Sequence, residues 1–304
     1  MDYPISRLNY SITDYLSSID IVRETVQKGG LKNNIILTEE NNGHDVLSEI
    51  DPNGQVYLSP SFCQFIWNVS YSALIVTDTL RILNELKKIG IKKDEFLTMI
   101  SAYDNVPEVS FLISELNAIS WKEILQAGFE CLKKKVTQET EQLLTKINLS
   151  SPFSKQVSGL YRAAISFVLL HELFHWQRNH FRCGKKRIEM EKEADDYAFN
   201  EMLQSSTDKT RKTNTIGPIC TLLSFFFINP QFINNGRYPY EDERLFAQFD
   251  KLIGVEKEAC RSIIVNIMEV WARFFKISGF PILTGCDESD LDNIRKFLSS
   301  YMRP

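Results

Sequence analysis

A long uncharged stretch that ends in a cluster of ionisable side chains constrains the fold of this chain more than any other feature. Residues 163–170 carry no charge, and a helix that is apolar on every side is buried in a protein interior. The next residues include His171, Glu172 and, one helical turn further on, His175. Burial of two imidazoles and a carboxylate is costly unless they have a partner. The stretch therefore predicts a core helix that ends at a binding site.

The spacing of these three residues is the HExxH pattern, which predicts a metal site. Residues i and i+4 lie on one helix face, so His171 and His175 can bind one zinc ion with their imidazole nitrogens. Glu172 would lie beside the open position of the metal, where it can act as a general base and proton shuttle. We therefore predict one Zn²⁺ per chain and a metallopeptidase reaction. The alternative is an exposed polar turn that closes a core helix.

A third histidine ligand is excluded by the residues that follow. A chain of the HExxHxxGxxH type would carry glycine and histidine where this sequence has Arg178 and Phe181. His180 comes one residue too early and lies about 140° around the helix from His175. A glutamate from a second helix is the remaining expectation.

The acidic segment 188–198 offers that glutamate. Glu191 shares a helical face with Ala194 and Ala198, whose small side chains allow close approach to a buried helix, whereas the face of Glu193 is polar. Glu191 is the predicted third ligand and Glu193 the second choice. Asp195, on the same face, would accept a hydrogen bond from the outer ring N–H of a zinc-bound histidine. The alternative here is an acidic helix on the surface.

A donor that stabilises the oxyanion of the transition state is expected in addition to the metal. The segment 237–244 contains three candidates with suitable side chains, Tyr238, Tyr240 and Arg244.

The rest of the sequence predicts a mostly helical protein with a small antiparallel β-sheet, an α+β chain around a zincin-like core. Strand signals occur at 34–38, 46–47 and 56–58, the last two on either side of a turn at 51–54 that favours a hairpin. We expect one domain with two lobes, 1–150 and 151–304. Helical periodicity covers 62–86, 92–102, 108–147, 156–181, 187–204, 256–278 and 288–302.

A second apolar segment raises the question of a membrane. Residues 213–236 carry no charge and 216–228 are nearly all apolar, but this part is shorter than the ~20 residues of a membrane span. It predicts a buried core helix, with contact to a membrane surface as the alternative.

Composition excludes several other classes. The net charge of −4 provides no electrostatic footprint for nucleic acid. The amino-terminal residues of the sequence lack the pattern of a signal peptide, and the six cysteines include no CxxC pair. A cytoplasmic location is expected, with peripheral contact to the inner membrane as the alternative.

The two motifs together resemble the gluzincin pattern of HExxH followed by ExxAD at 191–195, which prenyl-protein proteases and HtpX-type peptidases share. Those families carry transmembrane helices, so this likeness stops at the catalytic core. A broader resemblance, to the Lit-type phage-exclusion peptidases of bacteria, covers nearly the whole chain. It rests on RLNYS at 7–11, FCQFIW at 62–67, HELFHW at 171–176 and EADDYA at 193–198.

The Lit resemblance implies a cytoplasmic enzyme of bacterial abortive infection. Its substrate would be a translation factor, elongation factor Tu, and a phage-derived peptide bound to the target would activate cleavage. Two alternatives stay open. The chain could be a catalytically silent regulatory binding protein with a zincin fold, or a membrane-surface peptidase of the prenyl-protease or HtpX type.

Overall fold

Eleven helices and two small sheets make up the part of the chain that the computed structural model describes, residues 11–16, 19–41, 43–88, 90, 95, 98, 121–133, 137–147, 152–179, 186–230, 238–283 and 286–303. The helices are α1 (Ile12–Leu16), α2 (Asp20–Gln27), α3 (Pro60–Lys88), α6 (Trp121–Leu132), α7 (Gln138–Lys146), α8 (Pro152–Gln177), α9 (Arg187–Gln204), α10 (Arg211–Ile228), α11 (Glu241–Phe249), α12 (Gly254–Phe274) and α13 (Glu288–Tyr301). The strands are β1 (Ile35–Leu37), β2 (Glu40–Asn41), β3 (His44–Asp45), β4 (Ser48–Ile50) and β5 (Val56–Leu58). The expected mostly helical fold is confirmed.

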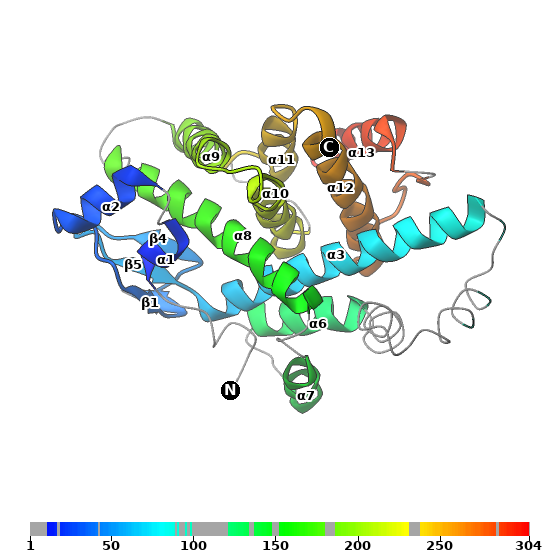
Figure 1. Cartoon of the computed structure of the whole chain (residues 1–304), viewed down its shortest axis with the longest axis horizontal. Helices are drawn as coiled ribbons and strands as arrows, with labels where there is room; N and C mark the ends of the chain where they lie inside the picture. The colour runs from blue at the N-terminus through cyan, green and yellow to red at the C-terminus, as the bar shows by residue number, and fades with distance from the viewer. Residues whose placement is uncertain are drawn as a thin grey trace.

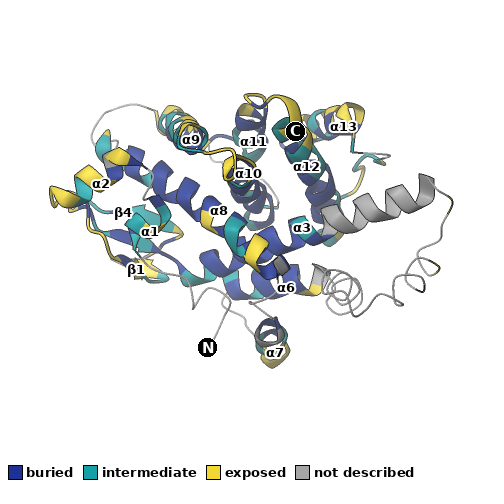
Figure 2. Cartoon of the chain, in the orientation of Figure 1, coloured by how far each residue is buried: buried dark blue, intermediate teal, exposed yellow. Residues whose placement is uncertain are grey.

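Two long helices, α3 and α8, cross the middle of the molecule, with the sheet at one end and α9–α13 along one side (Figure 1). The start of α3 follows from its sequence, because Ser59 Oγ accepts the Phe62 N–H at 3.0 Å and Pro60 occupies the first turn. Most of α8 is dark blue in Figure 2, as the uncharged run 163–170 requires. The predicted core helix is therefore confirmed, and it begins and ends four residues earlier than 156–181.

The apolar segment 216–228 forms the second half of α10 and is buried against α8. Gly217 makes this packing possible, because a Cβ at that position would stand 2.5 Å from the Cβ of Ala163. The prediction of a buried core helix is confirmed here. Among the described helices, the one long and apolar enough to cross a membrane is α8 over Phe153–Gln177, and 72% of its most apolar window is buried inside the fold.

The three-stranded sheet has the order β1-β5-β4 and is mixed rather than antiparallel. The predicted hairpin is present, since β4 and β5 pair antiparallel across the turn, with Ile50 opposite Val56. Its first strand is 48–50 rather than the expected 46–47. The expectation for β1 was wrong, because Ile35–Leu37 runs parallel to β5. Alternation of apolar residues fixes which face of a strand is buried but not its direction, so the sequence could not reveal the parallel pair.

Other helix predictions divide into three groups. The helices expected at 62–86, 187–204, 256–278 and 288–302 are confirmed, with shifts of up to four residues at their ends. A continuous helix over 108–147 is wrong, because α6 ends at Leu132 and α7 begins after Thr137, whose hydroxyl caps it. The helix expected at 92–102 and the start of 108–147 lie outside the described residues, apart from Glu95 and Thr98. The short helices α1, α2 and α11 were not predicted.

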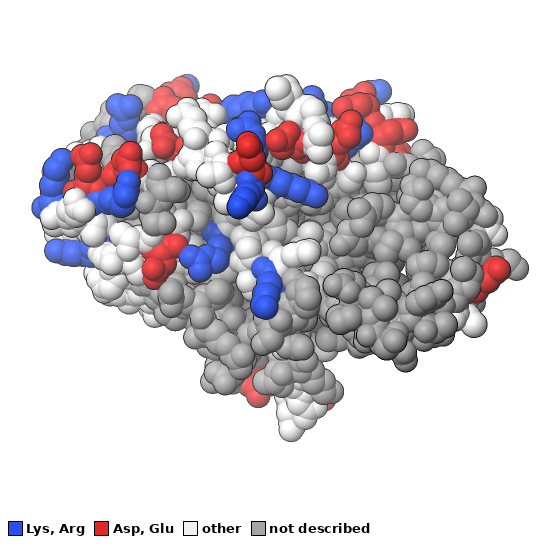
Figure 3. Space-filling model, viewed as in Figure 1, with Lys and Arg blue, Asp and Glu red and all other residues white. Residues whose placement is uncertain are grey.

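On the face shown in Figure 3, the described charged side chains are mixed in sign. Lys and Arg side chains alternate with Asp and Glu over α9 and the helices from α11 to α13, so neither sign forms a continuous patch there (Figure 3).

Candidate metal centre

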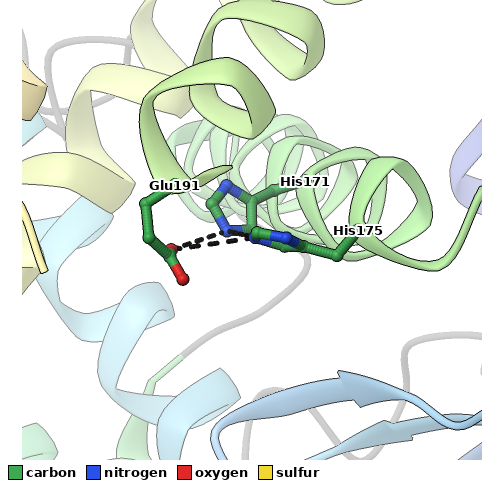
Figure 4. A group of neighbouring side chains, drawn as sticks. All are labelled: His171, His175 and Glu191. Atoms are coloured by element: carbon green, nitrogen blue, oxygen red, sulfur yellow. Dashed lines mark hydrogen bonds and ion pairs between the residues drawn. The ribbon is translucent and has the colours of Figure 1, made fainter. Parts of the chain in front are cut away.

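Three predicted ligands meet at one point between α8 and α9. His171 and His175 extend from α8, and Glu191 reaches toward them from α9 (Figure 4). The two Nε2 atoms are 3.0 Å apart, and Glu191 Oε2 lies 3.3 Å from that of His171 and 3.8 Å from that of His175. Their side chains are 10–12% exposed. This His-His-Glu group can hold a metal ion.

The sequence of α9 explains why this helix directs Glu191 toward α8. The face of α9 that carries Glu191 is buried, and Ala194 and Ala198 are fully shielded where this helix packs against α8. Small side chains at these positions let the two backbones approach closely. Glu193, on the adjacent face, is not part of the His-His-Glu group.

The spacing of the donor atoms fits a tetrahedral ion. Two ligands that are each about 2.0–2.1 Å from such an ion stand about 3.3–3.4 Å apart. The three observed separations, 3.0, 3.3 and 3.8 Å, bracket that value. Nδ1 of His171 is 2.9 Å from Asp195 Oδ1, and a proton on Nδ1 leaves the lone pair of Nε2 directed at the other two ligands. Asp195 thus occupies the position expected of a carboxylate that orients a ligand.

The electrostatics of the group favour a cation. Burial opposes a positive charge on His171. Hydrogen bonds to Asp195 and Glu191 outweigh this effect and raise the pKa of the imidazole to about 10 in the absence of a metal ion. Burial also disfavours ionised Glu191, yet the two histidines hold its pKa well below the ordinary value. The group is therefore an anionic cage whose nitrogens bind a positive charge, either protons or a metal ion.

Arg244 contacts Asp195 rather than the ligands themselves. Its Nε is 2.7 Å from Oδ2 and its Nη2 is 2.7 Å from Oδ1, a bidentate pair with Asp195 only 1% exposed. Burial alone would raise the pKa of Asp195, but Arg244 and then His171 lower it to about 2. Asp195 is consequently a permanent carboxylate at neutral pH. The sequence did not predict this ion pair.

Glu172 is held from the other side of the site by a residue that the sequence analysis missed. Ser48 Oγ, on β4, donates a hydrogen bond to Glu172 Oε1 at 2.7 Å. Burial raises the pKa of Glu172 above its ordinary value, although His171 and the Ser48 hydroxyl act in the opposite direction. A raised pKa suits a carboxylate that takes up and releases a proton near neutrality. No sequence signal marks Ser48, because the contact joins positions 124 residues apart.

The group opens into a cleft of about 640 Å³. It is lined by residues 45–49, which include the start of β4, and by residues of α8 and α9, among them Arg187 and Met190. Phe62, Phe167 and Phe225 make part of the lining apolar. The site is thus accessible to a ligand much larger than a metal ion.

The three candidate oxyanion donors occupy different places. Tyr238 lines the cleft, is 42% exposed and lies with its ring 4.3 Å from the Arg187 guanidinium. Arg244 also lines the cleft but is paired with Asp195. Tyr240 precedes α11 and lies beneath the guanidinium of Arg303, outside the cleft lining.

The chain combines an HExxH helix, a glutamate from a second helix and an open cleft. This arrangement is typical of metallopeptidases. The chain belongs to the family Peptidase U49, the Lit peptidase family, which it matches over residues 56–264. That match confirms the resemblance drawn from the sequence and includes every residue of the His-His-Glu group, whereas Ser48 lies before it. No curated protein and no solved structure matches the chain.

Proposed function

We propose that the protein is a zinc-dependent endopeptidase with Glu172 as general base. The observation that carries this proposal is the meeting of His171, His175 and Glu191 in an open cleft directly beside Glu172. Two imidazoles and one carboxylate are a ligand set typical of catalytic zinc, which leaves a fourth position for water or substrate. Membership of a peptidase family supports the same reaction class.

The residues around the cleft supply the proton transfers of peptide hydrolysis. Bound zinc would activate water and polarise the scissile carbonyl. Glu172 takes a proton from the attacking water while the water oxygen forms a bond to the carbonyl carbon. When the C–N bond breaks, the same carboxyl group delivers that proton to the leaving amine nitrogen. The Ser48 hydroxyl holds one oxygen of Glu172, so the other is the one directed to the reacting atoms.

The edge of β4 that faces away from β5 lies beside the site and suits an extended peptide. Backbone hydrogen bonds from Asp51 to Gln55 and from Ser59 to Leu47 show that residues 47, 49 and 51 face β5. By antiparallel alternation, the backbone groups of Ser48 and Ile50 point to the opposite edge, where no further strand pairs among the described residues. A substrate could add a strand there and pass its scissile bond in front of Glu172.

The substrate that we propose is elongation factor Tu, cleaved in the cytoplasm during abortive infection. This part of the proposal is supported by membership of the Lit peptidase family. A phage-derived peptide bound to the target would complete the substrate. Incubation of the purified protein with elongation factor Tu, with and without such a peptide, tests it. An intact factor under both conditions would remove this substrate and leave the reaction class standing.

Zinc content measured by elemental analysis tests the metal site independently of the reaction. Wild type is expected to hold about one zinc per chain. His175→Ala and Glu191→Ala should lose it, while Glu189→Ala, an exposed position on the same helix, serves as the matched control and should keep it. A wild type that takes up no zinc on reconstitution would contradict the proposal.

A catalytically silent binding protein is the second candidate. Retention of Glu172, with its raised pKa and its place in the cleft, disfavours it. Full zinc occupancy without cleavage of any protein or peptide tested would favour it.

A further inference from the structure

Arg244 reaches the metal group through another side chain, Asp195. Its guanidinium grips both oxygens of Asp195, and Oδ1 of that carboxylate also accepts from Nδ1 of His171. A continuous chain of short contacts therefore runs from α11 through α9 to the ligand on α8. All three side chains are at least 88% buried.

This chain fixes the orientation of the ligand. A carboxylate that only a histidine contacted could rotate about its side-chain bonds and carry the imidazole with it. Two parallel bonds from a planar guanidinium remove that rotation, because both oxygens are held in one plane. The face of Arg244 is itself held, since its central carbon lies 4.7 Å above the centre of the Phe225 ring on α10.

Further contacts keep α11 in place on α9. Asp196 accepts hydrogen bonds from Gln248 at 2.9 Å and from Lys251 at 2.7 Å, and Lys192 pairs with Glu243 at 3.0 Å. These contacts lie on the rim, whereas the Arg244–Asp195 pair lies in the interior. The rim contacts position the helix, and Arg244 transmits that position to the ligand.

We propose that Arg244 is a positioning residue for the metal site: by holding Asp195 in a bidentate pair it orients His171 and sets the affinity for zinc. The proposal rests on zinc binding by the His-His-Glu group. It differs from the expectation that Arg244 donates to an oxyanion, because two of its three guanidinium nitrogens bond Asp195.

The test compares zinc dissociation constants, measured by competition with a chelator of known affinity. Arg244→Gln removes the bidentate pair, and loss of such an outer contact weakens zinc binding roughly 10–100-fold. Arg244→Lys keeps the charge but cannot reproduce the fork, so we expect an intermediate weakening. The matched control is Arg303→Gln, which removes a bidentate pair with Asp242 and a bond to Glu243 on α11 but leaves the contacts of Asp195 and His171 in place. Its zinc affinity should equal that of wild type.

A second measurement separates positioning from general stability. Cobalt substituted for zinc reports ligand geometry through its visible absorption, so Arg244→Lys should change the band shape while Arg303→Gln should not. Thermal unfolding with chelator present gives the stability of each variant without metal. If Arg244→Gln does not fold, Arg244→Lys and Asp195→Asn test the proposal instead. Each should weaken zinc binding, and the losses of zinc affinity should not add in the double variant.

Three results would overturn the proposal. Unchanged zinc affinity in Arg244→Lys and Arg244→Gln with reduced cleavage would make Arg244 an oxyanion donor. An equal loss of zinc affinity in Arg303→Gln would mean that the loss in the Arg244 variants reflects the stability of α11. Additive losses in the double variant would show that Arg244 does not act through Asp195. A wild type without zinc would instead refute the proposed function, and this outcome is distinguishable because it needs no variant.

Discussion

The helical wall of the cleft, formed by α8 and α9, and the strand wall, formed by residues 45–49, hold their functional side chains in different ways. On the helical wall, both carboxylates that face His171 are buried in charged contacts, and Asp195 carries a bidentate arginine pair at 2.7 Å. On the strand wall, the described contact to the site is one hydrogen bond, from the uncharged hydroxyl of Ser48 to the carboxylate of Glu172. The arginine pair joins two opposite charges through two parallel bonds, whereas the hydroxyl brings a single donor and no charge of its own. We therefore propose that the helical wall retains the metal ion and that the strand wall adjusts the base.

Removal of the base is expected to give the largest effect on turnover and tests the separate roles of the two walls most directly. Glu172→Gln removes proton transfer, which contributes about 10²–10⁴-fold to such reactions. Zinc content should stay at the wild-type level, because the three ligands and Asp195 are untouched. Elemental analysis and a cleavage assay on the same preparation check both halves. Full turnover in this variant would show that Glu172 is not the base.

The next prediction concerns the helical wall without its metal. The pKa of His171 is raised from its ordinary value of 6.5 to about 10, so the protonated histidine stabilises the folded state fully below pH 6.5 and loses that contribution as the pH rises toward 10. The pKa of Asp195 is lowered to about 2, so its contribution is present above its ordinary value near 3.8 and disappears as the pH falls toward 2.

Thermal unfolding with chelator should accordingly show a maximum of stability between about pH 4 and 6.5 and a fall of several degrees toward pH 9. Zinc binds the deprotonated imidazole, so saturation with zinc should remove most of the alkaline fall. An alkaline fall of the same size with and without zinc would mean that His171 is not the group responsible.

The difference between the walls also explains how far the sequence could lead. Glu191 was predictable because the ligand and its neighbours Ala194 and Asp195 repeat at helical spacing on one face of α9. The helical wall is local in sequence, within two helices separated by fewer than ten residues. Periodicity reports contacts of this kind well.

The strand wall and the ion pair are distant in sequence and escaped prediction. Ser48 meets Glu172 across 124 positions, and Arg244 meets Asp195 across 49. No periodicity links such pairs, so a single sequence cannot identify them. For the same reason Arg244 and Asp195 were each visible as functional candidates, but their pairing was not. The parallel pairing of β1 with β5 was missed because pairing direction depends on the path of the chain between strands, 38–55, rather than on the strands themselves.

The smallest expected effect belongs to Ser48 and separates the roles of the two walls. Ser48→Ala removes one hydrogen bond to the Glu172 carboxylate, worth about 1.5–3 kcal/mol, but keeps the base itself, so turnover should fall by roughly ten- to hundred-fold. This bond lowers the pKa of Glu172, and its loss should raise that pKa and move the acid limb of the pH–rate profile to higher pH. Zinc affinity should not change, because this serine bonds Glu172 and is not part of the His-His-Glu group. Ser300→Ala, on an exposed turn of α13, is the control and should match wild type throughout. A shifted acid limb with unchanged zinc binding would show that the strand wall adjusts the base and the helical wall holds the metal. Weakened zinc binding in Ser48→Ala would mean that the two walls act as one unit.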